Sequence, residues 1–436
     1  MQKILRRGIR TAVDHYQKQL FVNPASSHTS SKVDIIGNGF KPDSPVTIQG
    51  TLICPEEGLD FQSYAHVYTD SKGSFDMATA ESLGGTYTGV DKMGLFWSME
   101  KQRESYDRAS LVNGSRRIPY TFSAFDNHLE TFVNGNMVAE EKITRHILDE
   151  NVTRTVVDEG DVKGTMFIPK GEGPFPVVIS LLGGVKRRQV PEQHAAYLAG
   201  HGFITFTLQF FGAEGLPKSY LSAPIDIALF EKGIEFLRNH PSVVAGEIGV
   251  LGESKGGDIG LSMMTHLPHV KSVCTLNGSV SSIAVPTVYK GIQTDAISGD
   301  PGRVRFLDDG SADISDCLDH PKDNPKSMHL FEQSSADLLM IVGQDDLNWK
   351  SELMASLAKE KMDVYGKSNY CIQSYENIGH FIDPPNFPIC THDYHPVIPN
   401  KIKCFFGGSN KQLNSKEQDT VWQNVVEFFR DSLTKH

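Results

Sequence analysis

The feature that most constrains this chain is a short apolar run, Ile248–Leu251, that leads into Gly-x-Ser-x-Gly at residues 252–256 and then into a helical pattern. A serine between a strand and a helix must lie in a sharp, strained turn, and the glycines leave room for the neighbouring backbone. Such a nucleophile elbow places the serine at the positive end of a helix dipole. We therefore predict that Ser254 is a nucleophile; a plain glycine-rich loop is the alternative for so short a pattern.

The elbow lies in a segment where short apolar runs alternate with helical patterns. The other runs that predict strands are Val177–Leu182, Phe203–Leu208, Val270–Cys274, Leu338–Val342 and Tyr370–Tyr375. Apolar residues have helical spacing in Glu192–Ala199, Pro224–Asn239, Gly256–Leu267, Ser351–Glu360 and Gln418–Leu433. Together they predict a mostly parallel sheet with helices on both faces. Residues 282–328 lack a clear period, and we interpret them as an insertion beside the site, either a lid or a surface excursion.

The first part of the chain has a different pattern. A chain of 436 residues exceeds the roughly 250 to 300 residues at which single cores stop growing, so we expect two domains. Short alternating runs between turn signals predict a β-sandwich domain at 33–147, followed by a catalytic domain at 148–436 that opens with a β-hairpin. Residues 1–32 are an N-terminal extension, whose basic and partly apolar start suits either a transit segment or a solvated tail.

A nucleophilic serine needs a base, and behind an elbow of this kind the chain order is serine, acid, histidine. Of the histidines after Ser254, only His380 follows a predicted strand in a glycine-led loop before the last helix. The strand that ends at Val342 is followed by Asp345 and Asp346, at the edge where active sites of parallel sheets lie. The residues alone leave both aspartates open as the acid.

An oxyanion beside the nucleophile needs two backbone N–H donors. One is expected from Lys255, the residue after the serine. The other is expected from the loop after the strand that ends at Leu182, at Gly184 or Val185.

Charge and cysteine spacing exclude several classes of protein. A net charge of -11 repels polyanions, so we expect no nucleic-acid partner, and no stretch reaches the roughly 18 apolar residues of a membrane span. The six cysteines lack metal-like or disulfide-scaffold spacing, which favours reduced thiols. His392 and His395 have the i, i+3 spacing of metal ligands, but no acid cluster accompanies them. We interpret them as surface or core histidines and expect no metal and no cofactor.

The sequence resembles a known family, the type I acyl-CoA thioesterases and the related bile acid-CoA:amino acid N-acyltransferases, over nearly the whole chain from about residue 33. The motifs that carry the resemblance are Lys41–Thr47, Leu83–Gly85, Met93–Trp97, Gly252–Gly257, Asn277–Ser279, Val342–Ser351 and Gly379–Pro385. The resemblance implies an immunoglobulin-like β-sandwich followed by an α/β-hydrolase domain. It also implies that the acid is Asp346 rather than Asp345.

The same resemblance implies an activity. Thioesterases of this family have serine at the elbow and the amino acid transferases have cysteine, so Ser254 implies hydrolysis of fatty acyl-CoA through an acyl-enzyme. The alternative is an acyl-CoA:amino acid N-acyltransferase that forms glycine or taurine conjugates. The expected partner is therefore an acyl-CoA substrate, the expected assembly a monomer or small homo-oligomer, and the expected location intracellular: cytoplasmic, with mitochondrial and peroxisomal as alternatives.

Two features depart from the family pattern. Glu253 places a carboxylate next to the nucleophile, and Lys186, Arg187 and Arg188 make the loop after Gly183 more basic. The basic run is interpreted either as a contact for CoA phosphates or as a solvated charge run.

Overall fold

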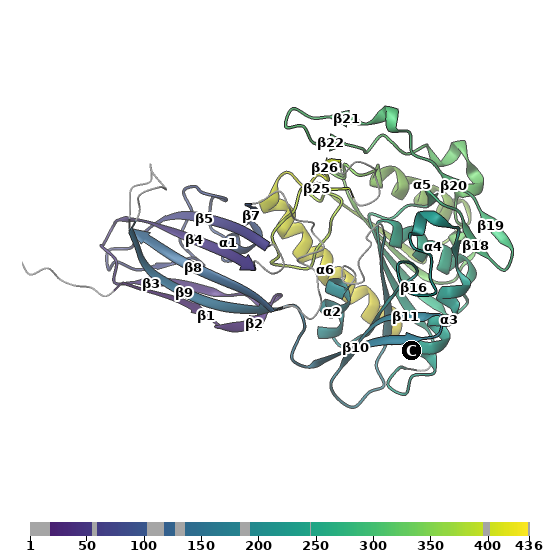
Figure 1. Cartoon of the computed structure of the whole chain (residues 1–436), viewed down its shortest axis with the longest axis horizontal. Coiled ribbons are helices and arrows are strands. Elements are labelled where there is room, and N and C mark those ends of the chain that lie inside the picture. Colours follow the sequence, from purple (N-terminus) through teal and green to yellow (C-terminus); the bar gives the residue numbers. More distant parts are fainter. Residues whose placement is uncertain are drawn as a thin grey trace, which may run out of the picture.

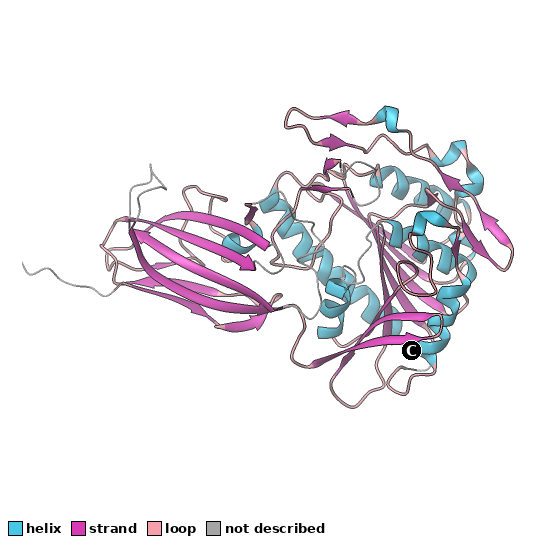
Figure 2. Cartoon of the chain, in the orientation of Figure 1, coloured by secondary structure: helices cyan, strands magenta, loops and turns pink. Residues whose placement is uncertain are grey.

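The computed structural model describes residues 18–54, 59–102, 117–126, 136–183, 192–244, 246–395 and 402–434. The chain forms an N-terminal lobe built of strands and a C-terminal lobe in which helices flank a large sheet (Figures 1 and 2). This is the predicted fold class, a β-sandwich followed by an α/β-hydrolase domain.

The N-terminal lobe is a sandwich of two sheets, ordered β2-β9-β8-β4-β5-β7 and β1-β3-β6. Its strands are β1 (Gln19–Asn23), β2 (Ser26–His28), β3 (Asp34–Asn38), β4 (Pro45–Cys54), β5 (Leu59–Tyr68), β6 (Phe75–Asp76), β7 (Glu100–Lys101), β8 (Arg117–Asp126) and β9 (Asn136–His146). Alternate residues of both sheets enter one core, which includes Leu20 and Ile35 from one sheet and Ile48 and Phe122 from the other. The short helix α1 (Gly94–Trp97) is also buried there.

The sandwich begins earlier in the chain than the expected boundary at residue 33. β1 pairs with β3, and β2 pairs with β9, so residues from 19 onward belong to the sandwich rather than to an extension. Leu20 and Val22 are buried on one face of β1. Of the expected extension at 1–32, whose basic start suits a transit segment, residues 1–17 lie outside the described residues.

The C-terminal lobe is built on an eight-stranded sheet with the order β10-β11-β13-β12-β15-β16-β23-β24. Its strands are β10 (Val152–Glu159), β11 (Val162–Pro169), β12 (Val177–Leu182), β13 (Ile204–Leu208), β15 (Ile248–Glu253), β16 (Val270–Leu276), β23 (Asp337–Gly343) and β24 (Tyr370–Tyr375). β11 is antiparallel to both of its neighbours, and from β13 to β24 every pairing is parallel. Only β12 and β13 exchange places relative to chain order, which is the strand order of the α/β-hydrolase fold.

Helices cover both faces of this sheet because its strands are apolar on both faces. The helices are α2 (Glu192–Gly200), α3 (Ala228–Arg238), α4 (Lys255–His266), α5 (Ser351–Val364) and α6 (Lys411–Thr434). Leu251 and Ile341 share a core with α2 and α6, whereas their chain neighbours Val250 and Met340 share a core with α3, α4 and α5. Among the described helices, none combines the length and the apolar composition that a membrane crossing requires.

The expected helix at Pro224–Asn239 was wrong at its start. β14 (Ile225–Asp226) occupies the first turn and pairs with β18 (Thr287–Tyr289), so α3 begins only at Ala228. The N–H of Ile225 donates to the carbonyl of Pro286 at 2.9 Å, a partner that is distant in the sequence.

The segment 282–328 folds into short elements rather than a long loop. It contains β17 (Ser282–Ile283), β18, β19 (Ile292–Thr294), β20 (Ala296–Ile297), β21 (Arg305–Phe306) and β22 (Ala312–Asp313). β22 joins β26 (Lys403–Phe405) and β25 (His392–Tyr394) in a four-stranded sheet. The N–H of Ile314 donates to the carbonyl of Leu347 at 3.2 Å, so the segment is fastened to the loop after β23.

The two lobes are joined by the segment that follows β24. The N–H of Ile389 donates to the carbonyl of Trp97 at 3.0 Å, and the Asn386 amide donates to the carbonyl of Thr29 at 3.0 Å. Phe387 and Ile389 are buried within the core of the sandwich. The C-terminal lobe therefore contributes side chains to the core of the N-terminal lobe.

Removal of the Phe429 ring tests the packing of α6 against the sheet. Phe429 is fully buried, and its ring centroid lies 6.3 Å from that of Phe203. We expect Phe429→Ala to lower the free energy of unfolding by about 3–5 kcal/mol, because the lost ring leaves a cavity that the surrounding side chains cannot fill. Urea denaturation measures this. Leu413→Ala, at a side chain 43% exposed on the same helix, is the control and should change stability by no more than about 0.5 kcal/mol.

Candidate active site

Ser254 lies at the turn between β15 and α4, in a backbone conformation that serine rarely adopts. Its φ is 57° and its ψ is -125°. The Ser254 N–H donates to the carbonyl of Leu276 on β16 at 2.9 Å, and its carbonyl accepts the N–H of Gly257 at 2.9 Å. Backbone strain of this kind is retained where the surroundings fix the turn, and it is concentrated at functional sites.

The flanking glycines are required by contacts between backbones. A Cβ atom on Gly252 would lie 2.2 Å from the carbonyl oxygen of Gly256, and a Cβ on Gly256 would lie 2.2 Å from that of Leu181. Both distances are far below van der Waals contact. The pattern around Ser254 is therefore a strand–turn–helix elbow and not a glycine-rich loop.

The structure brings Ser254, His380 and Asp346 into one chain of hydrogen bonds. Ser254 Oγ lies 3.0 Å from His380 Nε2, and His380 Nδ1 lies 2.9 Å from Asp346 Oδ2. An ionised Asp346 accepts only, so Nδ1 carries the hydrogen and Nε2 of neutral imidazole accepts from the serine hydroxyl. Such an arrangement can move the serine proton onto Nε2 while the carboxylate stabilises the resulting cation.

The two aspartates after β23 are used differently. Besides His380, Asp346 accepts the N–H of Asn348 at 2.8 Å and the Ser351 hydroxyl at 2.5 Å. Asp345 points the other way, and its Oδ2 accepts the N–H groups of Gly408 at 2.8 Å and Ser409 at 3.0 Å. Asp345 thus fixes the loop before α6, and only Asp346 lies against His380.

The His380 ring is held in place by aromatic neighbours and by its own backbone. Trp349 packs edge-on against it with ring centroids 4.9 Å apart, and Phe406 stacks on it at 6.1 Å. The N–H of His380 donates to the carbonyl of Phe406 at 2.8 Å. The His380 side chain is 3% exposed, so its orientation is fixed by packing as well as by Asp346.

Asn277 ties together the strand ends that carry these groups. It is completely buried, with a φ of 48° that asparagine tolerates better than most residues. Its Nδ2 donates to the carbonyls of Gly379 at 2.8 Å and His380 at 3.0 Å, and its Oδ1 accepts the N–H of Gly343 at 2.8 Å. The indole N–H of Trp349 donates to its carbonyl at 3.1 Å. One side chain therefore fixes the ends of β16 and β23 relative to the His380 loop.

Asn348 is a site residue that the sequence analysis did not single out. Its Nδ2 lies 3.1 Å from His380 Nε2, the same nitrogen that faces Ser254. The sequence signal was limited to Asp346, whose side chain is of the kind that accepts the backbone N–H of the residue two positions on. That bond is the one from Asn348 N–H to Asp346 described above. Spacing alone, however, does not show where the side chain points.

The residue after the nucleophile has an unusual buried side chain. Lys255 Nζ donates to Asp258 Oδ2 at 2.9 Å and to the carbonyl of Ile283 at 2.8 Å, while the same Asp258 oxygen accepts the Ile283 N–H at 3.0 Å. Burial lowers the pKa of Lys255 and raises the pKa of Asp258 to about 6. The pair therefore clamps the start of the 282–328 segment to the elbow.

Of the expected oxyanion donors, only Lys255 is among the described residues. The backbone N–H of Lys255 lies directly after Ser254, and a Cβ on Gly183 would lie 2.8 Å from that nitrogen, so Gly183 lies against it. Gly184 and Val185 lie outside the described residues, as do Lys186, Arg187 and Arg188.

Glu253, the acidic departure beside the nucleophile, points into the protein. It is completely buried, and its Oε1 accepts the N–H of Ile382 at 2.9 Å. The carboxylate therefore supports the segment that follows His380 rather than projecting from the elbow.

The two histidines with metal-like spacing have other contacts. His392 Nε2 lies 3.2 Å from Asp309, and the His395 ring stacks on Phe406 with centroids 6.1 Å apart. Burial lowers the pKa of His395 to about 4. In the described ranges, no group of three or more metal-ligating side chains is assembled.

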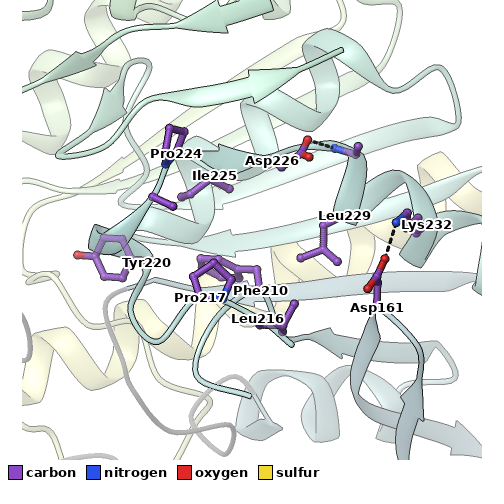
Figure 3. A pocket seen from close by; sticks show the side chains of 12 residues that line it. Asp161, Phe210, Leu216, Pro217, Tyr220, Pro224, Ile225, Asp226, Leu229 and Lys232 are labelled. Carbon is purple, nitrogen blue, oxygen red and sulfur yellow. Dashed lines mark hydrogen bonds and ion pairs between the residues drawn. The ribbon is translucent and has the colours of Figure 1, made fainter. Parts of the chain in front are cut away.

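A pocket of about 200 Å³ lies between the loop after β13 and the start of α3 (Figure 3). Apolar side chains surround it, among them Phe210, Pro217, Tyr220 and Leu229, and the Asp161–Lys232 ion pair lies at one end. Burial, with a smaller contribution from the charge of Asp258, raises the pKa of the Tyr220 phenol. Neither Ser254 nor His380 lines the pocket.

Comparison with known proteins gives whole-length matches. The family described as "BAAT / Acyl-CoA thioester hydrolase C terminal" matches residues 225–435, and "Acyl-CoA thioester hydrolase/BAAT N-terminal region" matches residues 30–159. "Acyl-coenzyme A thioesterase 2, mitochondrial" of Rattus norvegicus is 34% identical over 99% of this chain and 93% of its own length. "Acyl-coenzyme A thioesterase 6" of Homo sapiens is 33% identical over 91% of this chain and 92% of its own length.

Among solved structures, the Pyrococcus horikoshii acylaminoacyl peptidase matches 93% of this chain and 75% of its own, with 14% identity and a TM-score of 0.42. At this identity and TM-score the likeness carries no argument, and the fold is assigned from the strand order alone.

Replacement of one or both members of the buried Lys255–Asp258 pair tests how much the pair contributes to the free energy of unfolding. Lys255→Met alone should lower the free energy of unfolding by about 3–5 kcal/mol, because it leaves Asp258 buried without its counter-charge. The double variant Lys255→Met/Asp258→Leu should recover that loss, since it removes both desolvated charges. Urea denaturation of Lys255→Met, Asp258→Leu and the double variant measures the coupling between the two side chains. Equal losses for the single Met and the double variant would contradict the pairing.

Proposed function

The chain belongs to the acyl-CoA thioester hydrolase/BAAT family and is a hydrolase, and from this premise we propose that it hydrolyses fatty acyl-CoA through an acyl-enzyme on Ser254. The observation that carries the proposal is the hydrogen-bond chain from Ser254 through His380 to Asp346 at 3.0 and 2.9 Å. Serine hydroxyls are weak nucleophiles unless a base takes the proton, and this geometry supplies the base and its orienting carboxylate.

In the proposed acylation step, Ser254 Oγ attacks the thioester carbonyl and its proton moves to His380 Nε2. The carbonyl oxygen becomes an oxyanion, which the backbone N–H of Lys255 binds beside the N-terminus of α4. Collapse of the intermediate breaks the C–S bond, and the proton on Nε2 passes to the sulfur to give free CoA. The carboxylate of Asp346 stabilises the imidazolium while it carries that proton.

In the proposed deacylation step, water takes the position that the thiol has left. His380 accepts a proton from the water, the new C–O bond forms, and the bond to Ser254 Oγ breaks as the proton returns to that oxygen. The products are a carboxylic acid and the starting enzyme. The elbow residue favours this outcome over transfer to an amino acid, because the family resemblance assigns cysteine to the transferases.

Replacement of the nucleophile is the direct test. Ser254→Ala should lower kcat for a long-chain acyl-CoA by roughly 10⁴-fold or more, because the loss of one member of such a unit removes the covalent route. Released thiol is measured with a chromogenic disulfide reagent. Ser356→Ala, at an exposed serine on α5, is the control and should keep full activity.

Two results would contradict the proposal. The first is unchanged turnover by Ser254→Ala. The second is an N-acyl amide as the main product when acyl-CoA is incubated with glycine or taurine, which would favour the transferase alternative.

A further inference from the structure

The Asn348 carboxamide lies at the centre of the site without a structural role for its side chain. It is 7% exposed, and within the described ranges its Nδ2 contacts only His380 Nε2, at 3.1 Å. Its Oδ1 is buried and has no hydrogen-bond partner there. An unpaired buried carbonyl costs about 1–3 kcal/mol, so its retention calls for a reason.

Asn277 shows what a structural asparagine looks like in this site. Both of its amide atoms are bound, to Gly379, His380 and Gly343. Asn348, in contrast, is anchored through its backbone N–H to Asp346, and its carboxamide has a single hydrogen-bond partner among the described residues, His380 Nε2.

His380 Nε2 cannot satisfy both of its neighbours in the resting site. When Nδ1 carries the hydrogen, Nε2 has one lone pair, and two donors approach it: Ser254 Oγ at 3.0 Å and Asn348 Nδ2 at 3.1 Å. Acylation of Ser254 removes the serine hydroxyl, and a water molecule that donates to Nε2 then takes the lone pair. The Asn348 amide hydrogen loses its acceptor at that stage, whereas its unpaired Oδ1 can accept the second hydrogen of the same water.

From this geometry we propose that Asn348 is a further catalytic residue, whose Oδ1 binds and orients the water that deacylates Ser254. The inference rests on the proposed thioesterase function. In the step, the water oxygen forms a bond to the acyl carbon and gives one proton to His380 Nε2, while its other hydrogen stays on the water oxygen and donates a hydrogen bond to Asn348 Oδ1. The C–Oγ bond then breaks, the proton passes from Nε2 to Oγ, and the carboxylic acid leaves.

The test separates acylation from deacylation in the full-length enzyme. Asn348→Leu keeps the branching at Cγ and removes the polar atoms. It should leave the first release of CoA from a long-chain acyl-CoA nearly unchanged in a rapid-mixing experiment and lower steady-state turnover about 10²-fold, the loss typical of one positioned polar group. The acyl-enzyme should then accumulate and appear as an added acyl mass on the intact protein.

Ser351→Ala is the matched control. Its hydroxyl bonds to Asp346 Oδ2 at 2.5 Å and can act only through the acid, so it should slow the CoA burst and the steady state by similar factors. Asn348→Ala, which introduces a smaller side chain, serves as the second variant if Asn348→Leu does not fold. Circular dichroism checks the fold of each variant.

The outcomes are distinct. A parallel loss of burst and steady state in the Asn348 variants, or no loss of either, overturns the role of Asn348. A wild-type enzyme that releases no CoA overturns the proposed function and with it this inference, and the wild-type burst measured in the same series separates the two results.

Discussion

Backbone-to-backbone packing at the elbow is the constraint on which the rest of the site depends. The turn at Ser254 is closed only because Gly252, Gly256 and Gly257 carry no side chains; even at Gly257 a Cβ would lie 2.7 Å from the Cα of Gly278. The strained φ of Ser254 costs on the order of 1–3 kcal/mol, which the fixed positions of β15 and α4 offset. The hydroxyl is held at the sheet edge in this way before any substrate arrives, and the loops that carry the other groups close around it.

Much of the C-terminal lobe could be predicted because its signals are local. Short runs rich in apolar residues, separated by helices of regular period, predicted β12, β13, β15, β16, β23 and β24 close to their observed bounds. The choice between Asp345 and Asp346 was different. Both aspartates follow the end of β23. Their roles differ because Asp345 accepts hydrogen bonds from Gly408 and Ser409, which lie far along the chain. Local pattern cannot supply that partner, and the family resemblance was needed to favour Asp346.

The features that the sequence analysis missed depend on distant partners. β1 and β2 are short strands whose pairing with β3 and β9 gives them their structure, and β14 exists because the 282–328 segment pairs with it. Asn277 and Asn348 stand in motifs that resemble the family, but a motif does not state which atom faces which. Gly184 and Val185, the expected oxyanion loop, lie outside the described residues, so that part of the site stays a prediction.

The loop after His380 reaches across to the sandwich, where Phe387 and Ile389 join the core and the Trp97 carbonyl accepts a backbone hydrogen bond. The two lobes are therefore not interchangeable modules. A chain without the N-terminal lobe would keep the serine, the acid and the bonds from Asn277 to the His380 loop, yet it would expose Phe387 and Ile389, which follow the base in the sequence. The catalytic lobe on its own would therefore need another apolar surface to cover these two side chains.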